Sequence, residues 1–279
     1  MGNDRQGAVG ELDLIFRRRT NGQTYLAKRY FKLPMQVLQP FYQDKDGCAF
    51  LYLLNPSGGI LQNDVMTTKI VVEKNAKALV TTPANTKYYK MELGPAKLTN
   101  EIDVMDEAEM EYIPEHNVPF AKSKVFQETT FNIAESAKLI AFDMVTSGRL
   151  ARGEKFFYDI YSSKVKIFID GELKLYENAR LEPIKNPLNE VGKLEDNTIN
   201  ASIYFYQKDI DEEKVNKEIT DYFNNEEATI GGVTFVSNGL GIIRILGNEI
   251  MAMQECMNEC WGILRREMLG KDKIRIRKY

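Results

Sequence analysis

Histidine is nearly absent from this 279-residue chain, in which His116 is the only one. A single imidazole excludes any multi-histidine metal site, and a Ser-His-Asp mechanism would depend entirely on that one residue. His116 lies between Pro114 and Pro119, which indicates a loop. A lone loop histidine is most often a surface or hydrogen-bonded residue, and transient contact with a metal ion is the less common alternative.

Cysteine is also scarce, and neither sign of charge is in large excess. The chain has three cysteines: Cys48, Cys256 and Cys260. This small, odd number excludes a disulfide framework and is consistent with a reducing compartment. Cys256 and Cys260 could hold a soft metal ion, but no further strong ligand is near them in sequence, which favours buried structural thiols. A net charge of −3 argues against a nucleic-acid-binding protein.

Long apolar runs are missing as well. The first 19 residues contain no stretch of signal-peptide length. Elsewhere the apolar runs fall far below the roughly 18 residues that a membrane helix needs. We therefore expect a cytoplasmic, soluble protein without a membrane partner, and we interpret residues 1–279 as one domain.

What the sequence does contain is a β pattern over residues 1–208, rich in β-branched and aromatic residues. A repeat of strand, short polar turn and second strand begins at Ile70, Ile102 and Phe131, and a tighter version turns at Asp170-Gly171. A two-strand unit cannot bury its own apolar face, so neighbouring units must stack. The sequence predicts a mainly β fold of stacked β-hairpins in a solenoid-like, superhelical structure; an ordinary β-sandwich is the alternative.

Helices are predicted in the C-terminal part, residues 209–270. Residues 211–224 open with acids that suit a helix N-terminus. A stripe of apolar side chains from Leu246 to Met268 predicts a long amphipathic helix ending at Gly270. Met253, Met257 and Trp261 on this helix are candidate partner-binding residues, because methionine adapts to irregular surfaces; core packing is the alternative. Residues 271–279 form a basic tail.

Five acids near glycine or proline segments are the candidate site residues: Asp64, Glu115, Asp143, Glu154 and Glu177. Each could be a solvated or salt-bridged surface acid. The functional interpretation is a polar path of hard oxygen ligands that passes a divalent cation without trapping it, because carboxylates bind first-row metals more weakly than thiolate or imidazole clusters. A pair such as Asp143 and Glu154 could instead serve a hydrolase or sugar-active enzyme on a β-solenoid.

An ordered set of motifs resembles the UreD (UreH) family of urease accessory proteins. These motifs lie at Gly58–Asp64, Leu79–Tyr89, Glu111–Glu115, Asp143–Glu154, Arg244–Gly247 and Cys260–Arg265. The chain departs from the family pattern at three places. No histidine precedes Gly58, and the glutamine that the family often has between the proline and the acid is missing at Pro114-Glu115. The last five residues differ as well.

The resemblance implies a non-enzymatic urease maturation factor with a mostly β, superhelical fold. It implies nickel in transit rather than a tightly bound cofactor, and UreF-like and UreG-like accessory proteins and apo-urease as partners. The family motifs place Asp64, Asp143 and Glu177 on the expected metal path, with Glu115 and Glu154 as further candidates. The family role is that of a scaffold and conduit.

Overall fold

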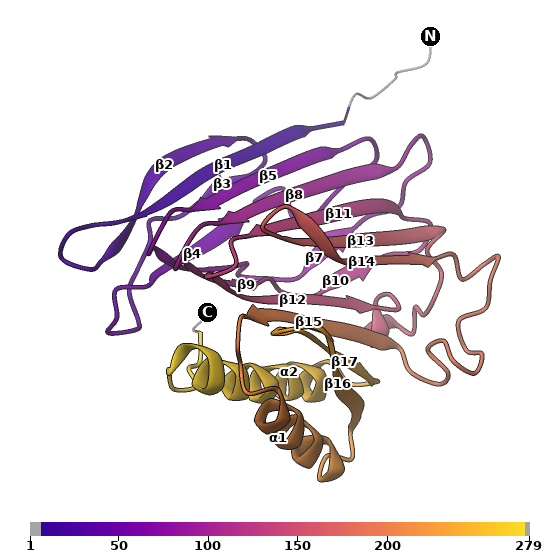
Figure 1. Ribbon diagram of the computed structural model, residues 1–279. Coiled ribbons are helices and arrows are strands. Elements are labelled where there is room, and N and C mark those ends of the chain that lie inside the picture. The colour runs from indigo at the N-terminus through magenta and orange to yellow at the C-terminus, as the bar shows by residue number, and fades with distance from the viewer. Residues whose placement is uncertain (1–6, 277–279) are drawn as a thin grey trace.

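The computed structural model describes residues 7–276 and contains two β-sheets that lie face to face, with the helices outside one of them (Figure 1). The first sheet contains, in spatial order, β14 (Glu172–Leu181), β13 (Ile160–Ile169), β11 (Lys124–Ile133), β8 (Ala96–Val104), β5 (Val65–Val72), β1 (Val9–Arg18) and β2 (Thr24–Lys32). The second contains β16 (Thr229–Ser237), β17 (Leu240–Gly247), β15 (Ile199–Gln207), β12 (Lys138–Thr146), β9 (Glu109–Ile113), β6 (Lys77–Thr81), β4 (Ala49–Leu54) and β3 (Gln36–Val37). Short strands β7 (Thr86–Tyr88) and β10 (Asn117–Pro119) join this sheet at β12.

The sequence repeat sets the register of both sheets. Ile70 pairs with Ile102, and Ile102 with Phe131, so the first strands of the three units run parallel in the first sheet. Their second strands, β6, β9 and β12, run parallel in the second sheet. The solenoid-like fold is confirmed, and the units differ from hairpins in one respect: each turns a corner between the sheets instead of pairing its own strands.

A buried alanine explains how the chain turns that corner. Ala76, Ala108 and Ala137 occupy the same offset in the three units, and all three are buried. A larger side chain would crowd the point where the two sheets approach each other. The Asp170-Gly171 unit does form the predicted hairpin, because β13 and β14 pair antiparallel.

The two faces of the second sheet belong to different parts of the core. One face packs against the first sheet, and the other packs against the helices, through residues such as Phe50, Ile140, Ile203 and Ile243. A sheet that is covered on both faces has near-continuous apolar strands, as in β15. A polar side chain on such a strand is therefore enclosed by protein.

The C-terminal helices follow the prediction with one correction. Helix α1 (Glu212–Asn224) begins at Asp211, whose side chain accepts a hydrogen bond from the Lys214 amide, as the acid-rich start predicts. Helix α2 (Ile250–Leu264) continues as a π-helical turn (Arg265–Leu269) that ends at Gly270. Leu246 is not part of this helix, because β17 extends to Gly247 through pairing with β15 and β16.

The glycine-containing segment before β17 forms strand β16. Strands β16 and β17 add residues 229–247 to the second sheet. The interpretation of residues 1–279 as one domain stays a prediction. A one-turn 3₁₀ helix spans Leu150–Arg152. None of the helices within residues 7–276 has the length and hydropathy needed to cross a membrane.

The beginning of the basic tail folds back on the protein. Lys271 places its Nζ 2.8 Å from Glu109 Oε2 and 3.0 Å from Asp46 Oδ2. Ile274 and Ile276 pack against the core beneath the helices. The last three residues of the predicted tail, 277–279, lie outside the described residues.

Candidate functional site: an acidic passage between the sheets

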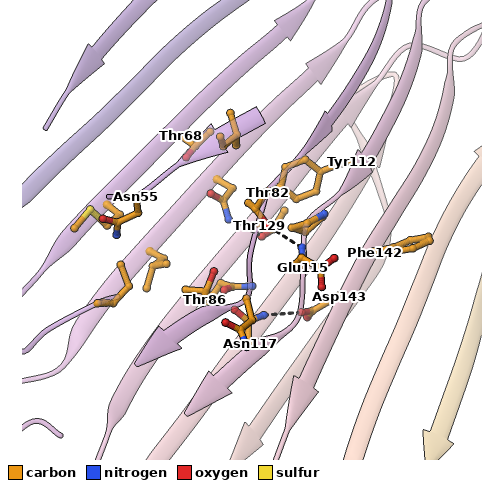
Figure 2. A pocket seen from close by; sticks show the side chains of 18 of the residues that line it. Asn55, Thr68, Thr82, Thr86, Tyr112, Glu115, Asn117, Thr129, Phe142 and Asp143 are labelled. Atoms are coloured by element: carbon orange, nitrogen blue, oxygen red, sulfur yellow. Dashed lines mark hydrogen bonds between the residues drawn. The ribbon is translucent and has the colours of Figure 1, made fainter. Parts of the chain in front are cut away.

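The space between the two sheets is not completely filled. A cavity of about 230 Å³ remains, here called the central cavity. Figure 2 shows Glu115, Asn117 and Asp143 at one end of it and Asn55 farther away. Its polar lining includes two carboxylates, one lysine and many neutral oxygens and amides, from Asn55, Thr68, Thr82, Asn85, Thr86, Lys87, Tyr88, Asn100, Tyr112, Glu115, Asn117, Gln127, Thr129, Asp143 and Tyr204.

Asp143 lies on β12, at the same end of the central cavity as Glu115 (Figure 2). Its Oδ1 is 3.4 Å from Asn117 Nδ2, and its Oδ2 accepts a hydrogen bond of 3.0 Å from Ser163. Burial raises the pKa of Asp143, and the negative charge of Glu177 raises it further. The surface that Asp143 leaves accessible faces the cavity rather than open water.

A second, smaller cavity of about 20 Å³ continues beyond Asp143 and reaches Glu177. It shares Asp143, Val165 and Tyr204 with the central cavity. The Tyr204 hydroxyl donates a hydrogen bond of 3.1 Å to Glu177 Oε2, and Arg244 approaches the same oxygen at 3.4 Å. A volume of this size admits about one water molecule or a partly dehydrated ion.

Each of the two cavities meets a larger surface depression. At the Glu115 end lies a groove of about 980 Å³ between α2, the folded-back tail and the sheet, here called the helix groove; it shares Pro114, Glu115 and Phe142 with the central cavity. Next to the small cavity lies a cleft of about 610 Å³, here called the outer cleft; it contains Arg244 and shares Leu181 and Asn200 with the small cavity. Four neighbouring spaces therefore follow one another, with Glu115, Asp143 and Glu177 in that order.

The two other candidate acids are held elsewhere. Asp64 accepts two hydrogen bonds of 2.8 Å from the backbone amides of Ala8 and Leu61. Glu154 accepts a 2.6 Å hydrogen bond from the Ala121 amide and pairs with Arg149. Although burial opposes it, the Arg149 contact holds the pKa of Glu154 below its usual value. Neither acid lines any of the four spaces.

These positions also bear on the hydrolase alternative. A carboxylate pair needs both groups to face one substrate-sized space. Asp143 faces the central cavity, whereas both oxygens of Glu154 are engaged by Arg149 and the Ala121 amide. The structure does not bring Asp143 and Glu154 together in any of the four spaces.

The predicted partner-binding residues are inside the protein. Met253, Met257 and Trp261 are 0%, 4% and 1% exposed, so they pack in the core beneath the helices. Their burial favours the core-packing alternative, although Met257 and Trp261 also line the helix groove. Met251, which is 83% exposed, is the outward-facing methionine of α2.

A buried charge cluster near this helix was not predicted. Glu111 accepts a 2.7 Å hydrogen bond from Trp261 Nε1, and the Arg265 Nε lies 3.1 Å from the same carboxylate oxygen. Arg265 also pairs with Asp44. Ligand atoms of Asp44, Cys48 and Glu111 lie within 4.8 Å of one another, but the guanidinium of Arg265 already supplies the positive charge there. The four-residue spacing of Trp261 and Arg265 was the available signal, since it places both on one helix face.

The buried thiols agree with the sequence interpretation: Cys48, Cys256 and Cys260 are all buried and free.

Comparison with known proteins identifies close sequence relatives. The sequence profile of the family described as UreD urease accessory protein matches residues 8–278. Over alignments that span nearly whole proteins, the chain is 32% identical to urease accessory protein UreD of Cenarchaeum symbiosum, covering 100% of this chain and 99% of that one. It is 29% identical to the protein of the same name from Vibrio parahaemolyticus (97% and 95% covered) and 28% to that of Bacillus cereus (92% and 94%). These relatives are named as accessory proteins, not as enzymes.

Proposed function

Because the chain belongs to the UreD family of urease accessory proteins, we propose that it acts in urease maturation as a docking scaffold and a nickel conduit. One observation supports the conduit: each of the four spaces shares lining residues with the next one. Their order is the helix groove, the central cavity, the small cavity and the outer cleft. Glu115, Asp143 and Glu177 stand along this order. In the proposal, nickel enters at one mouth and leaves at the other.

The electrostatic reason lies in the cost of dehydration. A divalent ion in a narrow passage loses water, and this costs several kcal/mol unless fixed oxygens compensate. Burial raises the pKa of Asp143, so its carboxylate is poorly stabilised by its own surroundings. A passing cation supplies the missing stabilisation and competes with a proton for the same oxygens. The competition keeps the ion from being held tightly.

The neutral lining supports passage rather than storage. Threonine, asparagine and tyrosine oxygens are hard ligands that bind a first-row metal weakly. The tyrosines around Asp143 stay protonated, because burial raises the pKa of Tyr88, Tyr161 and Tyr204 far above its usual value. Within residues 7–276, no cysteine lines any of the four spaces, so no thiolate is present there to trap the metal.

The two mouths suggest how partners are arranged. The helix groove and the outer cleft open at opposite ends of the series of spaces. We assign one mouth to a UreF-like and UreG-like accessory complex that delivers nickel, and the other to apo-urease. Met251 at the rim of the groove offers exposed apolar surface for such a contact. Action in the cytoplasm belongs to the same proposal.

The test replaces the three acids one at a time in the assembled accessory complex. We expect Glu115→Gln, Asp143→Asn and Glu177→Gln to assemble with their partners and to lower the nickel content of urease. Each 1.4 kcal/mol added to the transfer barrier slows loading about tenfold. Asp143→Asn should be milder than Asp143→Ala, because its amide keeps an oxygen.

The matched control is Asp106→Asn, an exposed turn residue that should load normally. Complex assembly is followed by size-exclusion chromatography, and nickel is measured by elemental analysis of purified urease. Wild-type nickel loading in all three variants would leave a docking scaffold without a conduit.

A further inference from the structure

We infer that Glu115 and His116 form a binding site for a divalent first-row transition ion at the neck between the helix groove and the central cavity. The inference rests on the proposed conduit for the identity of the physiological ion, nickel. Binding itself can be tested on the isolated chain. Glu115 lines both spaces, and His116 lines the groove, so an ion held between them would occupy the point where the two spaces meet.

The first observation is an unsatisfied buried ring nitrogen. His116 is only 6% exposed, and its Nδ1 has no hydrogen-bond partner among residues 7–276. A buried polar atom without a partner costs roughly 1–3 kcal/mol, so it is uncommon without a functional reason. Imidazole nitrogen is a preferred ligand for nickel, zinc and copper ions.

The second observation is the distance from this nitrogen to the neighbouring carboxylate. His116 Nδ1 lies 3.4 Å from Glu115 Oε2, without forming a well-directed hydrogen bond. Two ligand atoms that each lie about 2.1 Å from one ion, at a tetrahedral angle, are separated by about 3.4 Å. The pair therefore has the spacing of two ligands to a shared ion.

The surroundings hold the imidazole in place. The His116 carbonyl accepts a 3.0 Å hydrogen bond from the Thr86 amide, which ties the loop to β7. On the far side of the ring, Nε2 lies 3.3 Å from the Asn85 side-chain amide. The Asn85 atom nearest to Nε2 is the amide nitrogen Nδ2. A 180° turn of this amide exchanges Nδ2 for Oδ1, and Nε2–H can then donate to that oxygen while Nδ1 keeps its lone pair for a metal. Metal-binding histidines commonly have this outer partner on the second nitrogen.

Two protein ligands give a site suited to transfer. Gln254 of α2 donates a 3.0 Å hydrogen bond to Glu115 Oε2, so the helix positions the carboxylate from the groove side. The groove has ample room for the water molecules that would complete the coordination of the ion. An imidazole at this neck would also favour a transition metal over Mg²⁺ or Ca²⁺, which prefer oxygen ligands. The site would thus select the ion before it meets the oxygen-lined interior.

The single histidine makes the test specific. Tag-free protein is labelled with ¹⁵N-histidine, so that the imidazole signals report only His116. Titration with Ni²⁺ should broaden these signals, while Mg²⁺ should leave them unchanged. Isothermal titration with Ni²⁺ should show binding weakened about tenfold or more in His116→Asn and in Glu115→Gln. Glu255→Gln, which removes an exposed acid of the same groove, is the matched control and should bind like wild type.

Two results would overturn the inference. One is that the imidazole signals do not respond to Ni²⁺; the other is that the His116→Asn variant binds one equivalent of Ni²⁺ as tightly as wild type. If His116→Asn does not fold, the wild-type imidazole titration and Glu115→Gln decide the question. The conduit can fail separately. Normal Ni²⁺ binding at His116 together with unimpaired urease loading by Asp143→Asn would retain the site and reject the passage.

Discussion

Replacing Arg265 with methionine should strongly destabilise the protein. Arg265 is 0% exposed and lies 3.1 Å from Glu111, which is also buried. Methionine fills much of the same volume but leaves the Glu111 carboxylate with only the Trp261 hydrogen bond and the more distant charge of Lys271. Removing one partner of a buried ion pair costs about 3–5 kcal/mol. For a chain of 279 residues, this corresponds to a melting temperature lower by about 5–9 °C.

The penalty should depend on pH in a defined direction. Burial raises the pKa of Glu111, and Arg265 opposes that rise. A carboxyl whose folded pKa is raised contributes stability below its unfolded pKa and loses that contribution as pH rises through the folded pKa. Without Arg265, the folded pKa of Glu111 rises further. The cost of Arg265→Met should therefore be largest at neutral pH and should shrink as the pH falls and Glu111 becomes protonated.

Urea denaturation of wild type and variant at about pH 7.5 and about pH 5.5 measures this cost. Arg266→Met is the matched control, because Arg266 is the next residue and its side chain is 56% exposed, so we expect a loss below about 1 kcal/mol. Adding Glu111→Gln to Arg265→Met should restore about 1–3 kcal/mol, because residue 111 then carries no unpaired charge. A pH-independent cost, or strictly additive effects of the two substitutions, would refute the ion-pair explanation.

Two further predictions separate structural from functional roles. Asp64→Ala removes the acceptor of two hydrogen bonds, from the backbone amides of Ala8 and Leu61. We expect the free energy of unfolding, measured by urea denaturation, to fall by about 2–4 kcal/mol. Unchanged stability would contradict this structural role of Asp64. Met253→Glu places a charge in the core and should abolish the folded circular dichroism spectrum, whereas Met251→Glu should fold normally and weaken partner binding in a pull-down assay. A folded Met253→Glu variant would contradict the core assignment.

The repeat made much of the fold predictable. Three similar segments begin at Ile70, Ile102 and Phe131. Stacking such segments in register is the simplest way to bury their apolar faces. The sequence could not show whether the two strands of a unit pair with each other or separate at a corner. Both arrangements use alternating apolar residues and a short polar turn. The buried alanine in each turn is the physical difference, because an exposed hairpin turn has no need of a small residue there.

The buried ion cluster was harder to predict because its partners are far apart in sequence. Glu111 and Arg265 are separated by about half the chain, and each resembles an ordinary surface charge when read alone. Trp261 and Arg265 form part of the motif that resembles the UreD family, and the structure gives that motif a physical meaning. Both side chains contact the Glu111 carboxylate and attach α2 to the second sheet.

The candidate acids differ in what already binds their oxygens, and this difference sets how much each would gain from a nearby cation. Both oxygens of Asp64 accept backbone amides at 2.8 Å, so a metal ion would have to displace hydrogen bonds that hold the chain near β5. Asp143 receives only a neutral hydroxyl and one long contact from an amide, and it faces a cavity. A carboxylate that is enclosed but incompletely bonded gains most from a cation. For this reason, the search for a metal path in this protein should begin at Asp143 and proceed outward to Glu115 and Glu177.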